Sequence, residues 1–446
     1  MSTPAAPNSS STFTATVKVW RNLSRNDQQA VLARPVQKTS AALQQTVADI
    51  IATVKAQGDE AVLNYTAEFD NVRLPSLRFS AAEIADSAAK VDAKTRTAID
   101  VAYSTIHAFH SAQVPQNIQV ETRPGVVCEQ RFTPLQAVGL YVPGGTATLP
   151  STALMLGIPA QLAGCQRVVL VTPPAADGSL NPAVMYAAQK CGITEVYRCG
   201  GAQAIAALAF GTESIPKVDK VFGPGNSYVT AAKQMVAQDP QGCALDMPAG
   251  PSELMVIASA AANPAFVAAD LLSQAEHGRD SQVLLVSPSA ELLQAVATEL
   301  QQQLVQLPRR EIAAAALANS TLIQVDELAT AVAISQTYAP EHLSLQGAEA
   351  EALLDQLTTA GSIFVGDFTP EAGGDYATGT NHVLPTYGYA RVYSSLGLLD
   401  FYRRFTTQRA SQAGLASLGQ AIADLADAEG LTAHQRAVTI RLEPRS

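Results

Sequence analysis

The segment 270–280, DLLSQAEHGRD, carries three polar side chains at helical spacing. Asp270, Gln274 and His277 stand at i, i+4 and i+7, which places them within roughly 60° of arc on one helix face. Alanine and leucine form the opposite face, and Gly278 can end the helix in a left-handed cap. This short helix therefore aims an acid, an amide and an imidazole at one place. No motif gives Asp270 a role: it either supports the site residues from behind or faces solvent.

Gln274 and His277 can both bind one metal ion, because residues at i and i+3 share a helix face. A zinc ion that takes part in chemistry needs about three or four nitrogen or oxygen ligands and room for a substrate. Asp375, in GGDYATGTNH, and His434, near the C-terminus, could complete such a set. Glutamine is an uncommon zinc ligand, so spacing alone leaves an ordinary structural role open for these residues.

A second candidate lies in YAPEHLSL, where Glu341 and His342 are adjacent and follow Pro340. An imidazole that titrates near neutral pH beside a carboxylate can move protons at pH 7. The alternative is an ordinary helix start, with proline in the first turn and glutamate at the positive end of the helix dipole. The octapeptide by itself favours the helix start.

Two glycine turns mark places where a ligand can approach the backbone. Gly223 and Gly225, in FGPGNSYV, follow a predicted strand and precede a predicted helix, which is where phosphates bind. The dinucleotide-binding fingerprint is incomplete, because Tyr228 stands where its third glycine should be. The stretch CGGAQAIA is a similar turn. Both turns indicate ligand approach at the carboxyl ends of a parallel sheet, and neither identifies NAD.

The sequence between about residues 140 and 370 predicts the scaffold for these residues. Short β-branched runs such as RVVLVT and QVLLVS alternate with helical stretches, which is typical of parallel strands covered on both faces. Residues 40–112 are predicted to form polar-faced helices. The segment 366–386 has no period, and a loop of that length is usually functional or disordered. After Arg391 the sequence predicts a final helical unit.

The bulk composition excludes several classes of protein. The 446 residues are 47% hydrophobic and carry a net charge of −10, which argues against nucleic-acid binding. No apolar run reaches the roughly 20 residues of a membrane span. The opening residues, MSTPAAPNSSST, lack the pattern of a secretory signal and predict a flexible tail. Five scattered cysteines without a Cys-x-x-Cys pair predict reduced thiols and a cytoplasmic location.

Taken together, these segments resemble the histidinol dehydrogenase family from about residue 35 to the C-terminus. Eight motifs occur in the family's order: GLYVPGG, GGAQAIAALAFGT, GPGNSYVTAAK, DMPAGPSE, LLSQAEHG, APEHL, GGDYATGTNHVLPT and EGLTAHQRAV. So many motifs in one order make chance similarity negligible. The resemblance also accounts for the incomplete glycine fingerprint, since this family binds NAD without it.

The resemblance implies an α/β fold with two incomplete Rossmann-like parallel-sheet domains, one inserted in the other. On this chain it predicts a flexible tail and N-terminal arm over 1–34, and a discontinuous first domain over 35–140 and 253–390. The second domain would span 141–252. A helical segment over 391–446 would help build an intertwined homodimer with shared active sites.

The resemblance further implies a four-electron oxidation of L-histidinol to L-histidine through L-histidinal, in the last steps of histidine biosynthesis. One zinc ion per subunit and NAD would serve as cofactors, with no nucleic-acid or membrane partner. By motif, the zinc ligands would be Gln274, His277, Asp375 and His434, and the acid–base pair Glu341 and His342. Substrate contacts would be Ser252, His382 and Glu429 together with the zinc ligands and His342, and NAD contacts Tyr141, Gln203 and Asn226.

Two other readings of the sequence compete with this one. A relative of the same fold could oxidise another small alcohol, such as a sulfonated propanediol. Such a substrate lacks an imidazole and an amine, so its contact residues should differ, whereas His382 and Glu429 are both present. A catalytically silent binding or scaffold protein should have lost zinc ligands or the Glu341–His342 pair, and all of these are present.

Overall fold

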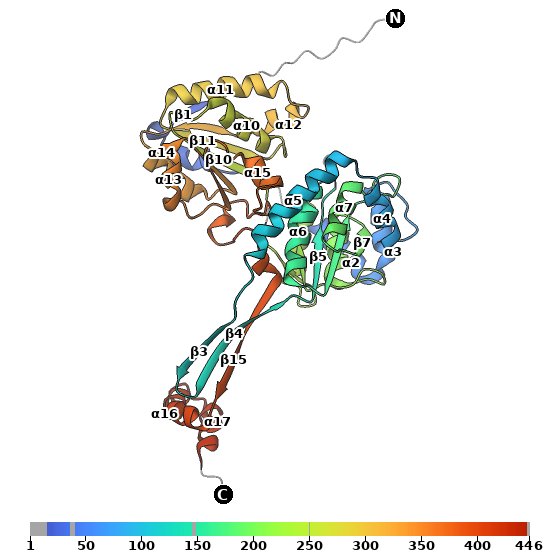
Figure 1. Ribbon diagram of the computed structural model, residues 1–446, viewed down its shortest axis with the longest axis vertical. Helices are drawn as coiled ribbons and strands as arrows, with labels where there is room; N and C mark the ends of the chain where they lie inside the picture. Colours follow the sequence, from blue (N-terminus) through green and yellow to red (C-terminus); the bar gives the residue numbers. More distant parts are fainter. Residues whose placement is uncertain (1–15, 36–40, 145–148, 249, 444–446) are drawn as a thin grey trace, which may run out of the picture.

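The computed structural model describes residues 16–35, 41–144, 149–248 and 250–443. These residues form two α/β units, each a sheet with its covering helices, and a long projecting arm (Figure 1). Residues 1–15 of the predicted tail lie outside this part of the chain. The rest of the segment 1–34, predicted as an N-terminal arm, contains the strand β1 (Val17–Val19) and the helix α1 (Arg25–Leu32). β1 pairs with a strand more than 300 residues later, which a local sequence pattern does not reveal.

The first sheet has the strand order β1-β12-β11-β10-β13-β14, with all neighbours parallel. Apart from β1, its strands are β10 (Glu253–Ala258), β11 (Gln282–Ser287), β12 (Thr321–Gln324), β13 (His342–Gln346) and β14 (Ser362–Val365). From the central β10 the chain moves outward through β11 and β12, and then returns to β13 on the other side. This reversal is the arrangement of a Rossmann-like sheet.

Helices cover both faces of the first sheet. Alternate residues of a strand point to opposite faces, so Leu254 and Val256 pack on one layer of helices while Met255 and Ile257 pack on the other. These helices are α10 (Pro264–Ala275), α11 (Ala290–Leu304) and α12 (Arg310–Leu317) on one face, and α1, α13 (Leu328–Tyr338) and α14 (Ala348–Glu351) on the other. Burial on both faces explains why the strands are continuously apolar, as predicted.

The second sheet repeats this order, β2-β7-β6-β5-β8-β9, and its edge strand β2 is antiparallel to β7. Its strands are β2 (Arg78–Phe79), β5 (Ala137–Tyr141), β6 (Arg167–Thr172), β7 (Glu195–Arg198), β8 (Lys220–Phe222) and β9 (Ala244–Leu245). Its helices are α2 (Ala41–Gln57), α3 (Asp59–Phe69), α4 (Ala81–Ala89), α5 (Ala93–Ser111), α6 (Pro150–Ala163), α7 (Pro182–Lys190), α8 (Gly201–Phe210) and α9 (Ser227–Gln238).

The predicted division of the chain differs from this packing. It grouped residues 35–140 with the first sheet, but the helices α2 to α5 pack on the second. Val47 of α2, for example, shares a core with Val169 of β6, and Ile106 of α5 shares one with Leu140 of β5. The apolar stripe of a helix fits either sheet, so the sequence does not reveal which sheet it covers. One unit is still inserted in the other, because the second sheet interrupts the first between β1 and β10.

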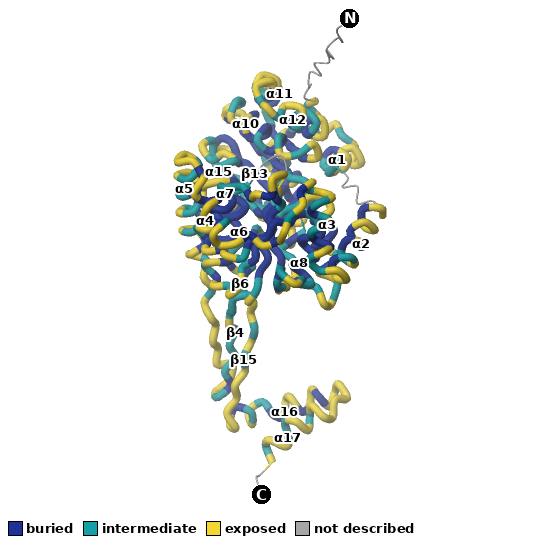
Figure 2. The backbone as a smooth tube through the Cα atoms, turned by 90° about the vertical axis from the view of Figure 1, so that its right-hand side faces the viewer, coloured by how far each residue is buried: buried dark blue, intermediate teal, exposed yellow. Residues whose placement is uncertain are grey.

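The arm is an antiparallel sheet of strand order β15-β4-β3 that ends in two helices (Figure 1). Its elements are β3 (Ile118–Arg123), β4 (Val126–Pro134), β15 (Tyr402–Ala410), α16 (Gln412–Ala428) and α17 (Thr432–Leu442). The predicted helical segment 391–446 therefore also contains a nine-residue strand, whose register is set by β4. Figure 2 shows that most of the arm and its two helices are exposed.

Two further sequence predictions concern thiols and membrane spans. All five cysteines are free, as predicted. Within the described residues, no helix is both long enough and apolar enough to cross a membrane.

Gly223 separates strand β8 from the glycine turn and tests how closely the second sheet is packed. Its φ is +120°, and a Cβ there would lie 2.2 Å from the carbonyl oxygen of Tyr141. Gly164, the C-cap of α6, also has positive φ, at +78°, but a Cβ there would meet nothing within 4 Å. The two glycines share backbone strain and differ in steric crowding.

We expect Gly164→Ala to cost about 1 kcal/mol, the strain of a left-handed alanine, and Gly223→Ala to cost about 3 kcal/mol or more. Urea denaturation followed by circular dichroism measures both. Equal losses for the two variants would show that the strand end at Gly223 relaxes to accept a methyl group.

Candidate active site and metal centre

Glu341 and His342 lie at the amino end of the first sheet, where β13 begins. Both are buried, and both are held by the main chain of Glu253, the first residue of the neighbouring strand β10. The Glu253 N–H donates to Oε2 of Glu341 at 2.9 Å, and the Glu253 carbonyl lies 3.1 Å from Nδ1 of His342. The octapeptide thus starts a strand, and the alternative of a helix start is wrong.

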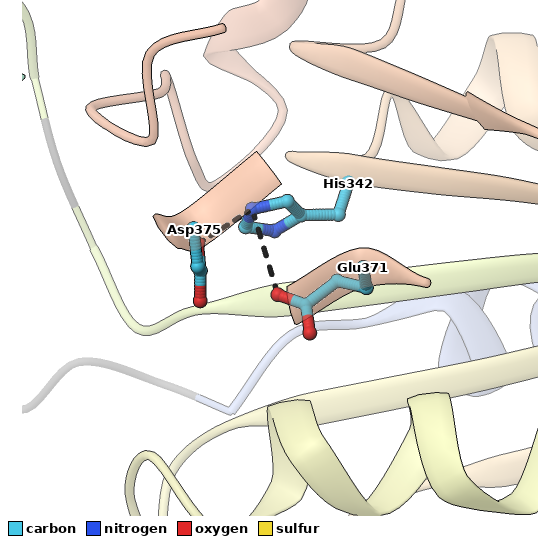
Figure 3. A group of neighbouring side chains, drawn as sticks. All are labelled: His342, Glu371 and Asp375. Atoms are coloured by element: carbon cyan, nitrogen blue, oxygen red, sulfur yellow. Dashed lines mark ion pairs between the residues drawn. The ribbon is translucent and has the colours of Figure 1, made fainter. Parts of the chain in front are cut away.

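The hydrogen bond from the main chain fixes the tautomer of His342. A carbonyl oxygen only accepts, so Nδ1 must carry a proton, and in the neutral ring the lone pair is on Nε2. Nε2 lies 3.8 Å from Oε1 of Glu371 and 4.0 Å from Oδ1 of Asp375 (Figure 3). Burial alone would lower the pKa of His342, but the three neighbouring carboxylates outweigh it and raise the pKa to about 10.

The two carboxylates facing His342 come from α15 (Glu371–Tyr376), a short helix inside the segment predicted as an aperiodic loop. Glu371 and Asp375 stand at i and i+4 and therefore share a helix face. Glu371 is fully buried, and its Oε2 accepts a hydrogen bond of 2.7 Å from the Ser273 hydroxyl, while its Oε1 has no hydrogen-bond partner. Burial and the charge of Glu371 raise the pKa of Asp375 to about 7.

Glu371 is the site residue that the sequence prediction missed. A signal was present, because Glu371 precedes Asp375 by one helical turn in PEAGGDY. The glycines between them made the segment read as a loop, and only the tertiary structure shows that it folds as a helix.

The end of α10 lies against these carboxylates, since Ser273 contacts Glu371 and His277 contacts Asp375, and Gln274 lies between the two in the sequence. Gln274 is fully buried, and neither its amide nitrogen nor its amide oxygen has a hydrogen-bond partner. His277 lies just beyond the helix, with Nε2 at 3.7 Å from Oδ2 of Asp375. The predicted cap at Gly278 is wrong, because the helix ends at Ala275 with right-handed backbone at the next residue.

Asp270, whose role the sequence left open, is buried behind the site and does not face solvent. One oxygen accepts from the amide nitrogen of Gln346 at 3.1 Å, and the other accepts from the backbone N–H of Glu371 at 3.4 Å. Burial raises the pKa of Asp270 to about 7. Asp270 thus ties α10 to the start of α15 and so helps to fix Glu371.

The donor set suits a divalent cation. Among the described residues, ligand atoms of His342, Glu371 and Asp375 lie within 4.8 Å of one another. This cluster shares Asp375 with the predicted zinc set and adds His342 and Glu371 to it. Buried carboxylates are costly without a compensating charge, and a buried amide such as Gln274 is costly without a partner. A cation bound among them would relieve both costs.

His382 links the two α/β units beside this cluster. Its Nδ1 lies 2.9 Å from the carbonyl oxygen of Asp375, and its Nε2 lies 3.2 Å from the hydroxyl of Thr152 on α6. Burial lowers the pKa of His382 to about 4, so the ring is neutral at pH 7. Ser252 stands directly before β10, where its carbonyl accepts from the N–H of Gln282 at 3.2 Å.

Glu429 and His434 are not brought into this cluster. Glu429 is the C-cap of α16 and His434 lies in α17, at the far end of the arm, and both are exposed. Figure 1 shows these helices well away from α10 and α15. Within one chain, the predicted zinc set is therefore missing one ligand and the predicted substrate contacts are missing two residues.

The three residues predicted to contact NAD gather at the carboxyl end of the second sheet. Tyr141 ends β5, and its hydroxyl accepts from the N–H of Gly201 at 3.1 Å; burial raises its pKa to about 12. Gln203, in the first turn of α8, is buried with its amide oxygen unpartnered. Asn226 caps α9 by accepting from two backbone N–H groups. This is the edge at which ligands bind in open α/β sheets.

Comparison with known proteins identifies the family. The sequence profile of histidinol dehydrogenase matches residues 32–442. A histidinol dehydrogenase of Idiomarina loihiensis is 60% identical over 430 residues, covering 96% of this chain and 97% of that protein. One from Colwellia psychrerythraea is 57% identical over 427 residues, covering 96% and 98%.

A solved structure gives the same answer for the fold. The crystal structure of histidinol dehydrogenase from Elizabethkingia anophelis superposes with a TM-score of 0.92 at 47% identity, covering 96% of this chain and 98% of that one. The two six-stranded sheets are thus those of a known enzyme fold, and the chain belongs to the histidinol dehydrogenase family.

Proposed function

We propose that this protein oxidises L-histidinol to L-histidine through L-histidinal, in two NAD-dependent steps at a zinc-containing site, and so completes histidine biosynthesis. The observation that carries the proposal is the buried Glu341–His342 pair, in which Nε2 of His342 faces the carboxylates of α15. Membership of the family supports the substrate. The free cysteines support a cytoplasmic location.

The proposed zinc ligands are Gln274, His277 and Asp375 of one chain and His434 of a second chain. Tyr141, Gln203 and Asn226 are the proposed NAD contacts. A zinc ion held by these residues would supply positive charge that orients the substrate and offsets the carboxylates around His342, and NAD would supply the hydride acceptor for each oxidation.

In the first oxidation His342 acts as the general base. Loss of hydride from the alcohol carbon requires the hydroxyl proton to leave, and Nε2 of His342 accepts it. The Glu253 carbonyl keeps Nδ1 protonated, so Nε2 is the nitrogen that exchanges the proton. The three carboxylates that raise the pKa of His342 to about 10 favour a proton on Nε2, and a cation bound beside them would lower that pKa by offsetting their charge. The product of this step is the aldehyde.

The second oxidation needs another oxygen atom, since an acid has one more oxygen than an aldehyde. Glu341 takes a proton from a water molecule as the water oxygen adds to the aldehyde carbon, and it returns that proton to the former carbonyl oxygen to give the hydrate. His342, after releasing its first proton, accepts one hydroxyl proton of the hydrate as the second hydride leaves. One alcohol, one water and two NAD⁺ then yield one acid, two NADH and two protons, four electrons having been removed as two hydrides.

We further propose that each active site is shared within a homodimer. The helices of the arm expose Ile422, Leu425 and Ile440, and no described residue of α17 is buried. Such a small helical unit cannot bury a core alone and needs a larger surface to pack on. In a two-fold dimer, the arm of one chain would deliver Glu429 and His434 to the site of the other, where Ser252 and His382 complete the substrate contacts.

His277→Asn should remove the zinc site without unfolding the protein, because the side chain is largely exposed and contacts Asp375 at the rim of the cluster. We expect dialysed protein to hold little zinc and to show no turnover. His107→Asn, on α5, is the matched control. Zinc that remains at one ion per chain in His277→Asn, measured by elemental analysis, would refute the ligand assignment.

Glu341→Gln should slow the second oxidation most, because an amide cannot take a proton from water. The amide oxygen can still accept from the Glu253 N–H, so the local fold is retained. With histidinal as substrate we expect turnover at least about a hundredfold below wild type, the usual contribution of a general base. Near-normal oxidation of histidinal would remove Glu341 from the mechanism.

Mixed dimers test whether sites are shared. His342→Asn and His434→Asn, each inactive alone, are unfolded and refolded together in equal amounts, and mixed dimers are verified by mass. Random pairing makes half of the dimers mixed, and one of their two sites has both residues intact, so roughly a quarter of wild-type activity should return. If each site forms within one chain, every site keeps a lesion and activity stays near zero.

A further inference from the structure

We propose that the buried ion pair between Arg34 and Glu253 positions the catalytic pair Glu341 and His342. Arg34 thereby couples the N-terminal segment 16–35 to catalysis. The inference rests on the proposed function, because it takes Glu341 and His342 as the groups that move protons. Neither Arg34 nor Glu253 touches the reacting atoms in that mechanism, so both act through their neighbours.

The pair has the geometry of a clamp. Nε of Arg34 donates to Oε1 of Glu253 at 2.8 Å, and Nη2 donates to Oε2 at 2.6 Å, so the two planar groups form a bidentate fork. Nη2 also donates to the carbonyl of Tyr338 at 2.7 Å, and the guanidinium lies 3.9 Å from the centre of the Tyr338 ring. Arg34 is thereby fixed on both sides.

Burial makes each charge depend on the other. The Glu253 side chain is 2% exposed and that of Arg34 is 14% exposed. Burial raises the pKa of Glu253, and the guanidinium opposes that shift. Burial likewise acts to lower the pKa of Arg34, and the Glu253 carboxylate reverses the effect and raises it. Loss of Arg34 would leave a buried carboxylate without its counter-charge beside Glu341.

The main chain of Glu253 carries this clamp to the catalytic pair. Its N–H holds the Glu341 carboxylate and its carbonyl holds Nδ1 of His342. Its side chain also accepts from the backbone N–H of Tyr387, beyond the segment that carries Asp375 and His382. If the carboxylate rotates or takes up water, the first residue of β10 shifts, and both catalytic side chains lose their alignment.

The test compares Arg34→Met, Glu253→Gln and the double variant in the full-length holoenzyme. Arg34→Met leaves the Glu253 charge unpaired, so we expect kcat for histidinol to fall at least about tenfold while KM for NAD, which binds at the other sheet, stays within about twofold. Glu253→Gln in the Arg34→Met background removes the stranded charge, and we expect it to recover most of the lost kcat.

Two controls separate positioning from general stability. Arg21→Met removes another arginine of the N-terminal segment 16–35. The ion pair between Arg21 and Asp326 is exposed, so this variant should leave kcat unchanged. Rates are normalised to folded, zinc-loaded protein. If Arg34→Met does not fold, Arg34→Lys keeps the charge but loses the fork, and we expect it to show the same kcat loss at smaller size.

An unchanged kcat in the Arg34 variants, or a double variant no faster than Arg34→Met, would overturn the inference. Wild-type protein that fails to oxidise histidinol would instead overturn the proposed function. The two failures are distinguishable, because the first concerns ratios between variants and the second concerns the wild type alone.

Discussion

Buried negative charge is the constraint on which this structure depends. Glu253, Glu341, Glu371 and Asp375 lie within one small region, and each is less than 10% exposed. Arg34 compensates the first of them, and His342 lies near the other three. Carboxylates persist at such depth only when opposite charge is close, so the arrangement favours a cation. The unpartnered amide of Gln274 points to the same requirement.

The two sheets share one strand order, but their candidate functional residues lie at opposite ends of the strands. Candidate NAD contacts lie at the carboxyl ends of the second sheet, the usual position for ligands in open α/β sheets. The proposed catalytic pair lies at the amino ends of the strands of the first sheet, because β13 begins at His342 and β10 begins at Glu253. The contact between His382 and Thr152 connects the two α/β units near the proposed catalytic pair. The substrate, which donates hydride, and NAD, which accepts it, can therefore be held by different sheets.

The arm has no comparable core. β3 and β15 are mostly exposed and β4 is half-buried (Figure 2). The helices α16 and α17 expose leucine and isoleucine side chains. A surface of this kind is stable when another surface covers it. The same helices carry Glu429 and His434, which the cluster around His342 lacks within one chain. Packing and chemistry therefore both support the proposal that the arm completes the site of a neighbouring subunit.

The sequence by itself determined the alternation of strands and helices, the family, and which candidate site residues are close along the chain, because each of these is encoded by residues near one another in the sequence. Glu341 and His342 are adjacent, and Gln274 and His277 are one turn apart. Tertiary structure decided the rest. The segment PEHL begins a strand and not a helix. The helix α15 forms and brings Glu371 to the site. The helices α2 to α5 pack on the second sheet. Tertiary structure also brought Arg34 to Glu253, 219 residues away. Contacts at such separations depend on how sheets pack, and no local pattern encodes them.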